Sequence, residues 1–79
     1  MKLSKALKNL MTEFDVVYGS DEFLPCPVDR LVRSGEAKIL SSSGHGITFS
    51  YGGARLCQVY EDQSLEIWTG QEWVVLACA

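Results

Sequence analysis

The sequence predicts a single α+β domain spanning residues 1–79, with an N-terminal amphipathic helix followed by an antiparallel meander of four to five strands or a small β-barrel. Three observations predict this fold. The chain has 79 residues, which is the length of one domain. Apolar residues near the start recur with helical spacing, and after residue 36 the pattern changes to the two-residue period of strands. The segments between these strands are short and rich in turn residues, so each strand folds back beside the previous one.

Residues 2–13 are predicted to form the helix, because apolar side chains follow one stripe along it. The stripe consists of Leu3, Leu7, Leu10, Met11 and Phe14. The opposite side carries Lys2, Lys5 and Lys8, which would face solvent or bind an anionic partner. Ser4 is a candidate N-cap residue.

The segment between the helix and the sheet has a less regular pattern. Residues 15–18 have the composition of a short strand that Gly19 would end. Residues 19–29 are predicted to form an extended loop, because Pro25 and Pro27 exclude regular strand pairing. Residues 29–34 fit either a single helical turn or the beginning of a strand.

The sheet is predicted from five segments whose side chains suit strands. They span residues 36–42, 46–51, 55–60, 64–69 and 72–77. The last two segments contain both tryptophans. If Gly70 and Gln71 form a two-residue turn, Trp68 lies directly opposite Trp73 on the neighbouring strand.

This register sorts the hairpin side chains into two faces. An apolar face, expected to join the core, consists of Leu65, Ile67, Val74 and Leu76. The other face consists of Glu66, Trp68, Trp73 and Val75. Two interpretations of the tryptophan face remain open: the N-terminal helix covers it, or a protein partner does, since tryptophan is enriched in binding hot spots.

No motif in the chain predicts catalysis, a cofactor or a metal. "SSSGHGIT" (residues 41–48) contains glycines and a Ser–His combination, but a strand rather than a helix follows it, and no third orienting group is adjacent. Cys26, His45, Cys57 and Cys78 lack the close pairs typical of zinc sites. An odd number of cysteines, three, fits reduced thiols better than a disulfide framework, although a disulfide between two of them stays open.

Charge and hydropathy limit the classes of partner. The net charge of −3 does not favour nucleic-acid binding. Residues 1–38 hold six of the seven basic residues, and residues 39–79 hold four acidic residues against Arg55, so an oriented or head-to-tail association is one interpretation. No segment resembles a signal peptide or membrane span, and we expect the protein to work without a membrane.

The segment "DQSLEIWTGQEWVVL", residues 62–76, resembles hairpins of bacteriophage virion proteins. The layout is also similar to that of the small head–tail attachment proteins of tailed phages, in which a helix and a loop precede an antiparallel barrel. The positions that follow the phage pattern are Asp62, Leu65, Ile67, Gly70, Trp73 and Val75, with one spacing shifted. The resemblance implies a non-enzymatic assembly protein that contacts copies of itself or other virion subunits, in the virion or in the host cytoplasm during assembly.

An alternative class is a small phage-encoded inhibitor of a host defence complex. Such a protein would bind through acidic side chains that mimic nucleic-acid phosphates. The candidates for this acidic face are Glu61, Asp62, Glu66 and Glu72.

Overall fold

The computed structural model describes residues 4–19 and 26–77, and their fold is α+β, as predicted. In these ranges, helices α1 (Lys5–Tyr18) and α2 (Pro27–Ser34) precede five strands. The strands are β1 (Lys38–Ser42), β2 (Gly46–Tyr51), β3 (Ala54–Val59), β4 (Ser64–Trp68) and β5 (Trp73–Ala77). They form one sheet in the order β1-β2-β3-β4-β5 with every neighbouring pair antiparallel, which confirms the meander.

Helix α1 spans Lys5–Tyr18, so it begins and ends later than the predicted residues 2–13. The Ser4 hydroxyl accepts a hydrogen bond from the Leu7 amide at 3.3 Å, which confirms Ser4 as the N-cap residue. The predicted strand at residues 15–18 is wrong, because α1 continues to Tyr18. The aromatic rings of Phe14 and Tyr18, one helical turn apart, lie 5.3 Å apart between centroids, so the stripe that packs on the core extends from buried Phe14 to partly buried Tyr18.

Helix α2 covers the last residues of the predicted loop and extends the helical turn predicted as one alternative for residues 29–34. Residues 20–25 of the predicted loop lie outside the described residues. Pro27 occupies its first position, where the missing amide hydrogen costs nothing. Gly35 ends it with a φ of +83°, and the amides of Glu36 and Ala37 both donate to the Leu31 carbonyl. The side chains of Val28 and Leu31 are buried, so α2 belongs to the core layer.

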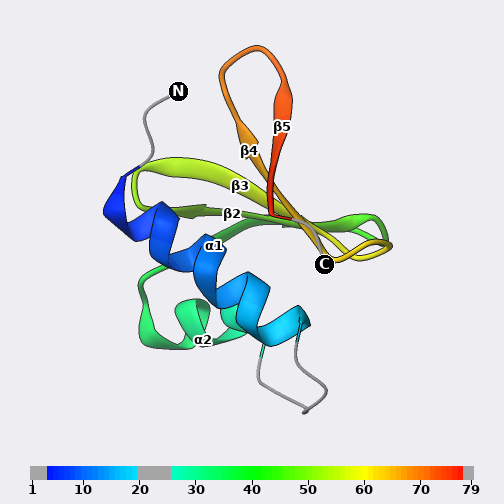
Figure 1. The fold of residues 1–79 in the computed structure, drawn as a ribbon. Coiled ribbons are helices and arrows are strands. Elements are labelled where there is room, and N and C mark those ends of the chain that lie inside the picture. Colours follow the sequence, from blue (N-terminus) through cyan, green and yellow to red (C-terminus); the bar gives the residue numbers. More distant parts are fainter. Residues whose placement is uncertain (1–3, 20–25, 78–79) are drawn as a thin grey trace.

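The two helices lie on the same face of the sheet (Figure 1). The core between the layers consists of Leu7, Leu10, Phe14, Val28, Leu31, Ala37, Phe49, Leu56, Leu65, Ile67 and Ala77. The barrel alternative is wrong, because β1 and β5 are the two edges of an open sheet and do not pair with each other. The helices, rather than strand closure, therefore remove this face of the sheet from water.

The β4–β5 hairpin has the predicted register at its tip and a shifted register at its base. Trp68 pairs with Trp73 and Ile67 with Val74, but a bulge makes Leu65 pair with Ala77 instead of Leu76. Ala77 is consequently buried, and Leu76 is only partly buried. The prediction that Val74 lies in the core is also wrong: its side chain is 37% exposed, because the hairpin tip extends away from both helices (Figure 1).

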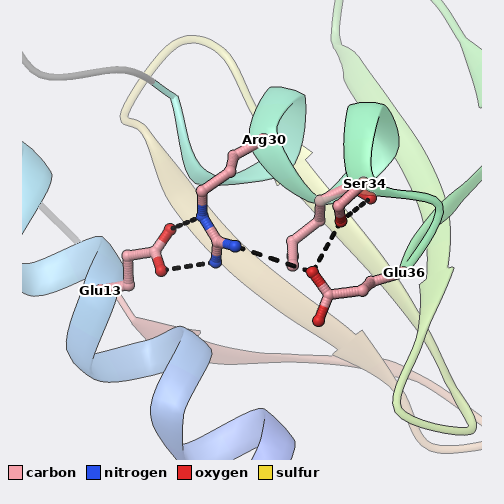
Figure 2. Close-up of polar contacts among 5 residues, drawn as sticks. Glu13, Arg30, Ser34 and Glu36 are labelled. Carbon is pink, nitrogen blue, oxygen red and sulfur yellow. Dashed lines mark hydrogen bonds and ion pairs between the residues drawn. The ribbon is translucent and has the colours of Figure 1, made fainter.

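An ion-pair cluster joins the two helices to the chain that leads into β1 (Figure 2). The Arg30 guanidinium donates to both carboxylate oxygens of Glu13 on α1, at 3.2 and 2.7 Å. A second carboxylate, from Glu36, lies 3.7 Å from the guanidinium and accepts a hydrogen bond of 2.6 Å from the Ser34 hydroxyl. This exposed cluster links α1, α2 and the segment before β1, although exposed ion pairs of this kind contribute little to stability.

The core assignment predicts that Ile67→Ala lowers the free energy of unfolding by roughly 2–5 kcal/mol, since it leaves a cavity at a side chain that is 4% exposed. Its cross-strand partner provides the control. Val74→Ala, on the same face but near the hairpin tip, should cost less than about 1 kcal/mol. Urea denaturation of the two variants measures both values, and equal losses would contradict the assignment.

Candidate protein-binding surface

The turn of the β4–β5 hairpin is held by the side chain of Thr69. Its hydroxyl oxygen accepts hydrogen bonds from the amides of Gln71 and Glu72, at 3.3 and 3.2 Å, and donates to the Glu72 carbonyl at 3.1 Å. The Thr69 amide donates to the same carbonyl at 3.0 Å. Gly70 has a φ of +102°, a conformation that other residues rarely adopt. These contacts set the register of β4 and β5, the two strands that the turn connects.

The Trp68–Trp73 pair occupies the first position of the ladder next to this turn. Because Thr69 and Glu72 are hydrogen bonded, the tryptophans form the adjacent non-hydrogen-bonded pair, in which side chains lie closest. Their ring centroids are 5.4 Å apart with an interplanar angle of 54°. Tilted aromatic pairs at this distance contribute about 0.5–1.5 kcal/mol beyond area burial, so the pair also stiffens the hairpin.

The predicted face of Glu66, Trp68, Trp73 and Val75, here called the hairpin surface, lies on the side of the sheet away from the helices. The interpretation in which α1 covers the tryptophans is therefore wrong. Trp73 is 39% exposed and Val75 is 56% exposed, while Trp68 and Glu66 are partly buried. Two large apolar side chains thus face solvent side by side on a strand at the sheet edge.

The predicted lysine row is separate from the hairpin surface. Lys5 and Lys8 are exposed on α1, which packs on the opposite face of the sheet. Lys2 lies outside the described residues. The two sets of predicted binding residues therefore cannot contact one small partner surface together.

The acidic residues of the predicted inhibitor face are also dispersed. Glu61 and Asp62 lie in the turn before β4, whereas Glu72 lies in the turn after it. These turns are at opposite ends of a five-residue strand, roughly 13 Å apart. Glu66 alone belongs to the hairpin surface, so these four carboxylates do not form one acidic patch.

A cleft that the sequence did not predict opens between α2 and strands β1 to β3. Its volume is about 140 Å³, and it is lined by Cys26, Val28, Asp29, Val32, Ile39, Ile47, Gln58 and Tyr60. This is close to the size of a cavity of about 150 Å³ that accommodates benzene. Ile39 and Tyr60 at its edge are 44% and 42% exposed, so the cleft opens to solvent.

Polar side chains meet at the inner end of this cleft. The Gln58 amide donates to the Tyr18 hydroxyl at 2.6 Å and to Gln63 Oε1 at 3.2 Å. The Cys26 sulfur lies 3.5 Å from both the Tyr18 hydroxyl and Gln58 Oε1. Burial, together with the hydrogen bond and charge of Cys26, raises the pKa of Tyr18 to about 12, although the Gln58 hydrogen bond opposes this shift. Tyr18 therefore stays protonated at neutral pH and acts as a hydrogen-bond donor rather than a base.

The cysteines do not converge. Cys26 faces the helix side of the sheet, where it contacts Gln58, whereas Cys57 precedes Gln58 in β3 and faces the other side. Both are free thiols, and burial raises the pKa of the Cys57 thiol. Cys78 lies outside the described residues. Among residues 4–19 and 26–77, no cluster of three or more histidine, cysteine or acidic side chains is placed to hold a metal ion.

One feature of the sequence, a glutamine at a core position of β3, could have indicated the polar cluster. Gln58 alternates with Leu56 and Ala54, so it is a polar residue on the core face of β3, and it is only 4% exposed. Amides at such positions need hydrogen-bond partners. Its partners Tyr18 and Cys26 come from other elements and share no spacing with it, so only the folded chain identifies them.

The comparisons with known proteins identify no relative. No protein-family model matches the chain, and neither a curated protein nor a solved structure matches it significantly. Within the described ranges, neither α1 nor α2 has the length and apolar character needed to cross a bilayer.

The raised pKa of Tyr18 predicts a pH dependence of stability. The folded-state value, about 12, exceeds the ordinary value of 10.0, so the stabilisation is complete below pH 10 and is lost as the pH rises towards 12. The stability advantage of the wild type over Tyr18→Phe should therefore shrink across this interval. Urea melts of both proteins from about pH 9 to about pH 12 measure the difference, and an unchanged difference would contradict the hydrogen bonds of the partly buried phenol.

Proposed function

We propose that the protein is a non-enzymatic binding protein that acts in the assembly of a larger complex through the hairpin surface. The observation that carries this proposal is the exposure of Trp73 and Val75 on the face without helices. Exposed apolar side chains that lie together on a small protein mark interaction sites. Tryptophan in particular contributes a large share of binding energy when a partner buries it.

Local contacts hold the side chains of the hairpin surface before any partner binds. The Thr69 turn fixes the register, and the Trp68 ring supports one side of the Trp73 ring. A side chain that is already held in place loses little conformational entropy on binding. Glu66, paired with Val75 across the ladder, places a carboxylate beside the apolar side chains and suits a polar rim.

The setting that we propose is the assembly of a tailed-phage virion. Its support is the resemblance of the Trp–Gly–Trp hairpin to phage virion proteins, and the hairpin is the part of the chain that carries the exposed surface. The open sheet differs from the barrel that the head–tail attachment layout implies. The proposal therefore rests on the hairpin, with other virion subunits or further copies of the chain as partners.

The inhibitor alternative has less support. It requires carboxylates gathered on one face, whereas Glu61 and Asp62 lie at the opposite end of β4 from Glu72. Gene position distinguishes the two classes. Neighbouring genes for portal, capsid or tail proteins favour assembly, and a neighbouring small helix-turn-helix regulator favours the inhibitor.

The proposal predicts that Trp73→Ala weakens association with the partner by about 2 kcal/mol or more, as truncation of hot-spot residues does. The isolated fold should lose about the 0.5–1.5 kcal/mol that the tryptophan pair contributes, which is less than the loss in Ile67→Ala, since Trp73 is 39% exposed. Sedimentation of the pure chain, and titration against the products of neighbouring virion genes, measure association, while a urea melt measures the fold.

Two variants serve as controls. Ile67→Ala should lower stability without removing a contact residue, and Lys8→Ala, on the far side of the sheet, should change neither property. If Trp73→Ala unfolds the free protein as severely as Ile67→Ala, the tryptophans belong to the core and the binding surface lies elsewhere. If Lys8→Ala weakens association instead, the α1 lysines are the binding site.

A further inference from the structure

The two edges of the sheet differ in how well they are protected against pairing with another strand. The β1 edge contains Lys38, two serines and a bulge at Leu40, features that discourage edge-to-edge pairing. The β5 edge contains no charged residue in Trp73–Ala77. Its bulge lies near the end, by Leu76 and Ala77, and Ala77 is buried in the core. Residues 73–75 therefore form an apolar and regular edge that pairs with no other strand among residues 4–19 and 26–77.

The hydrogen-bonding groups of this edge follow from the ladder with β4. Since Thr69 and Glu72 are hydrogen bonded, Ile67 and Val74 form the next hydrogen-bonded pair, and the backbone groups of Val74 point towards β4. The amide and carbonyl groups of Trp73 and Val75 consequently point away from the sheet. The outward amide and carbonyl groups thus belong to alternate residues. A further antiparallel strand pairs with the backbone groups of alternate residues, so it could accept and donate hydrogen bonds at both positions.

We infer that this edge binds a second copy of the chain, with the two β5 strands antiparallel and a two-fold axis at Val74. In this register Trp73 and Val75 of one copy exchange backbone hydrogen bonds with Val75 and Trp73 of the other. Val74 faces its own counterpart on the helix-bearing face. The proposal rests on the proposed function, since it names the partner of the hairpin surface.

Side-chain exposure favours the second copy as the occupant. Val74, Trp73 and Val75 are 37%, 39% and 56% exposed, and they are the exposed large hydrophobic residues of β5. The two-fold register brings all of them into contact with the other copy. On the helix-bearing face, the two Val74 side chains meet at the axis. On the opposite face, Trp73 of each copy packs against Val75 of the other. A self-complementary patch of this kind produces the two-fold dimer that is the commonest protein oligomer.

The charges near the edge permit this arrangement. Glu72 lies two residues from the axis, so the two Glu72 side chains are about 14 Å apart along the strands. This separation exceeds the Debye length of about 8 Å at physiological salt. Each β5 is itself uncharged, so no carboxylates face one another across the junction.

Cross-linking tests the register directly. Cα atoms of a non-hydrogen-bonded antiparallel pair are about 4.5 Å apart, within the range of a disulfide. Val74→Cys should therefore form an intersubunit disulfide on mild oxidation, located by mass spectrometry of the linked peptides. The matched control is Val75→Cys, whose two copies would be about 8 Å apart and too distant to link.

Sedimentation equilibrium and amide exchange test the dimer without oxidation. Val74→Lys places two ammonium groups at the axis and should raise the dissociation constant at least about 100-fold. Because Val74 is exposed, the monomer should keep its fold, which circular dichroism verifies. The amides of Trp73 and Val75 should exchange slowly in the wild-type dimer and rapidly in Val74→Lys.

The outcomes separate this inference from the proposed function. A wild-type chain that stays monomeric, a dimer that Val74→Lys leaves intact, or a cross-link through Val75→Cys in place of Val74→Cys would each overturn the inference. If the chain is monomeric but binds another virion subunit in a Trp73-dependent way, the proposed function stands without the dimer. If Val74→Lys fails to fold, the pair of cysteine variants still decides.

Discussion

Burial of one sheet face by the two helices is the constraint on which the rest of the structure depends. A chain of 79 residues has enough helix to cover a single face, and α1 and α2 both pack on the face of Phe49, Leu56 and Leu65. A sheet of short antiparallel strands needs such a layer, because its apolar face would otherwise contact water. In the part of the chain that the structure describes, no second layer covers the opposite face, and the hairpin surface lies there.

The same constraint explains why the β4–β5 hairpin has two different ends. At its base, the bulge turns Ala77 into the core beside α1. At its tip, the strands extend past the helical layer, so Val74 is exposed although it shares a face with buried Ile67 (Figure 1). A protein that exposes large apolar side chains at a regular sheet edge invites association, and the absence of charge in β5 does not oppose it.

The cleft by α2 is a second product of this one-sided packing. Helix α2 is short and covers β1 to β3 incompletely, which leaves an apolar hollow with Gln58 and Cys26 at its inner end. The Gln58 amide donates hydrogen bonds to Tyr18 and Gln63, as a buried amide requires. Tyr18 reaches this cluster only because α1 continues past Phe14.

The sequence by itself determined the features that depend on neighbouring residues. Period-two alternation and short turns determined the number and order of the strands, and the Gly70 turn determined that Trp68 faces Trp73. The alternation also determined that the tryptophans lie on the face of the hairpin opposite to that of Ile67, because successive side chains of a strand point to opposite faces.

Only the tertiary structure decided which face the helices cover, where α1 ends, and that Ala77 rather than Leu76 enters the core. The β-branched residues Val16 and Val17 favour a strand locally, but packing of the helical stripe overrides that preference. The cleft likewise joins residues from separate elements. Each of these features arises from contacts between distant segments, whose free energies no local pattern encodes.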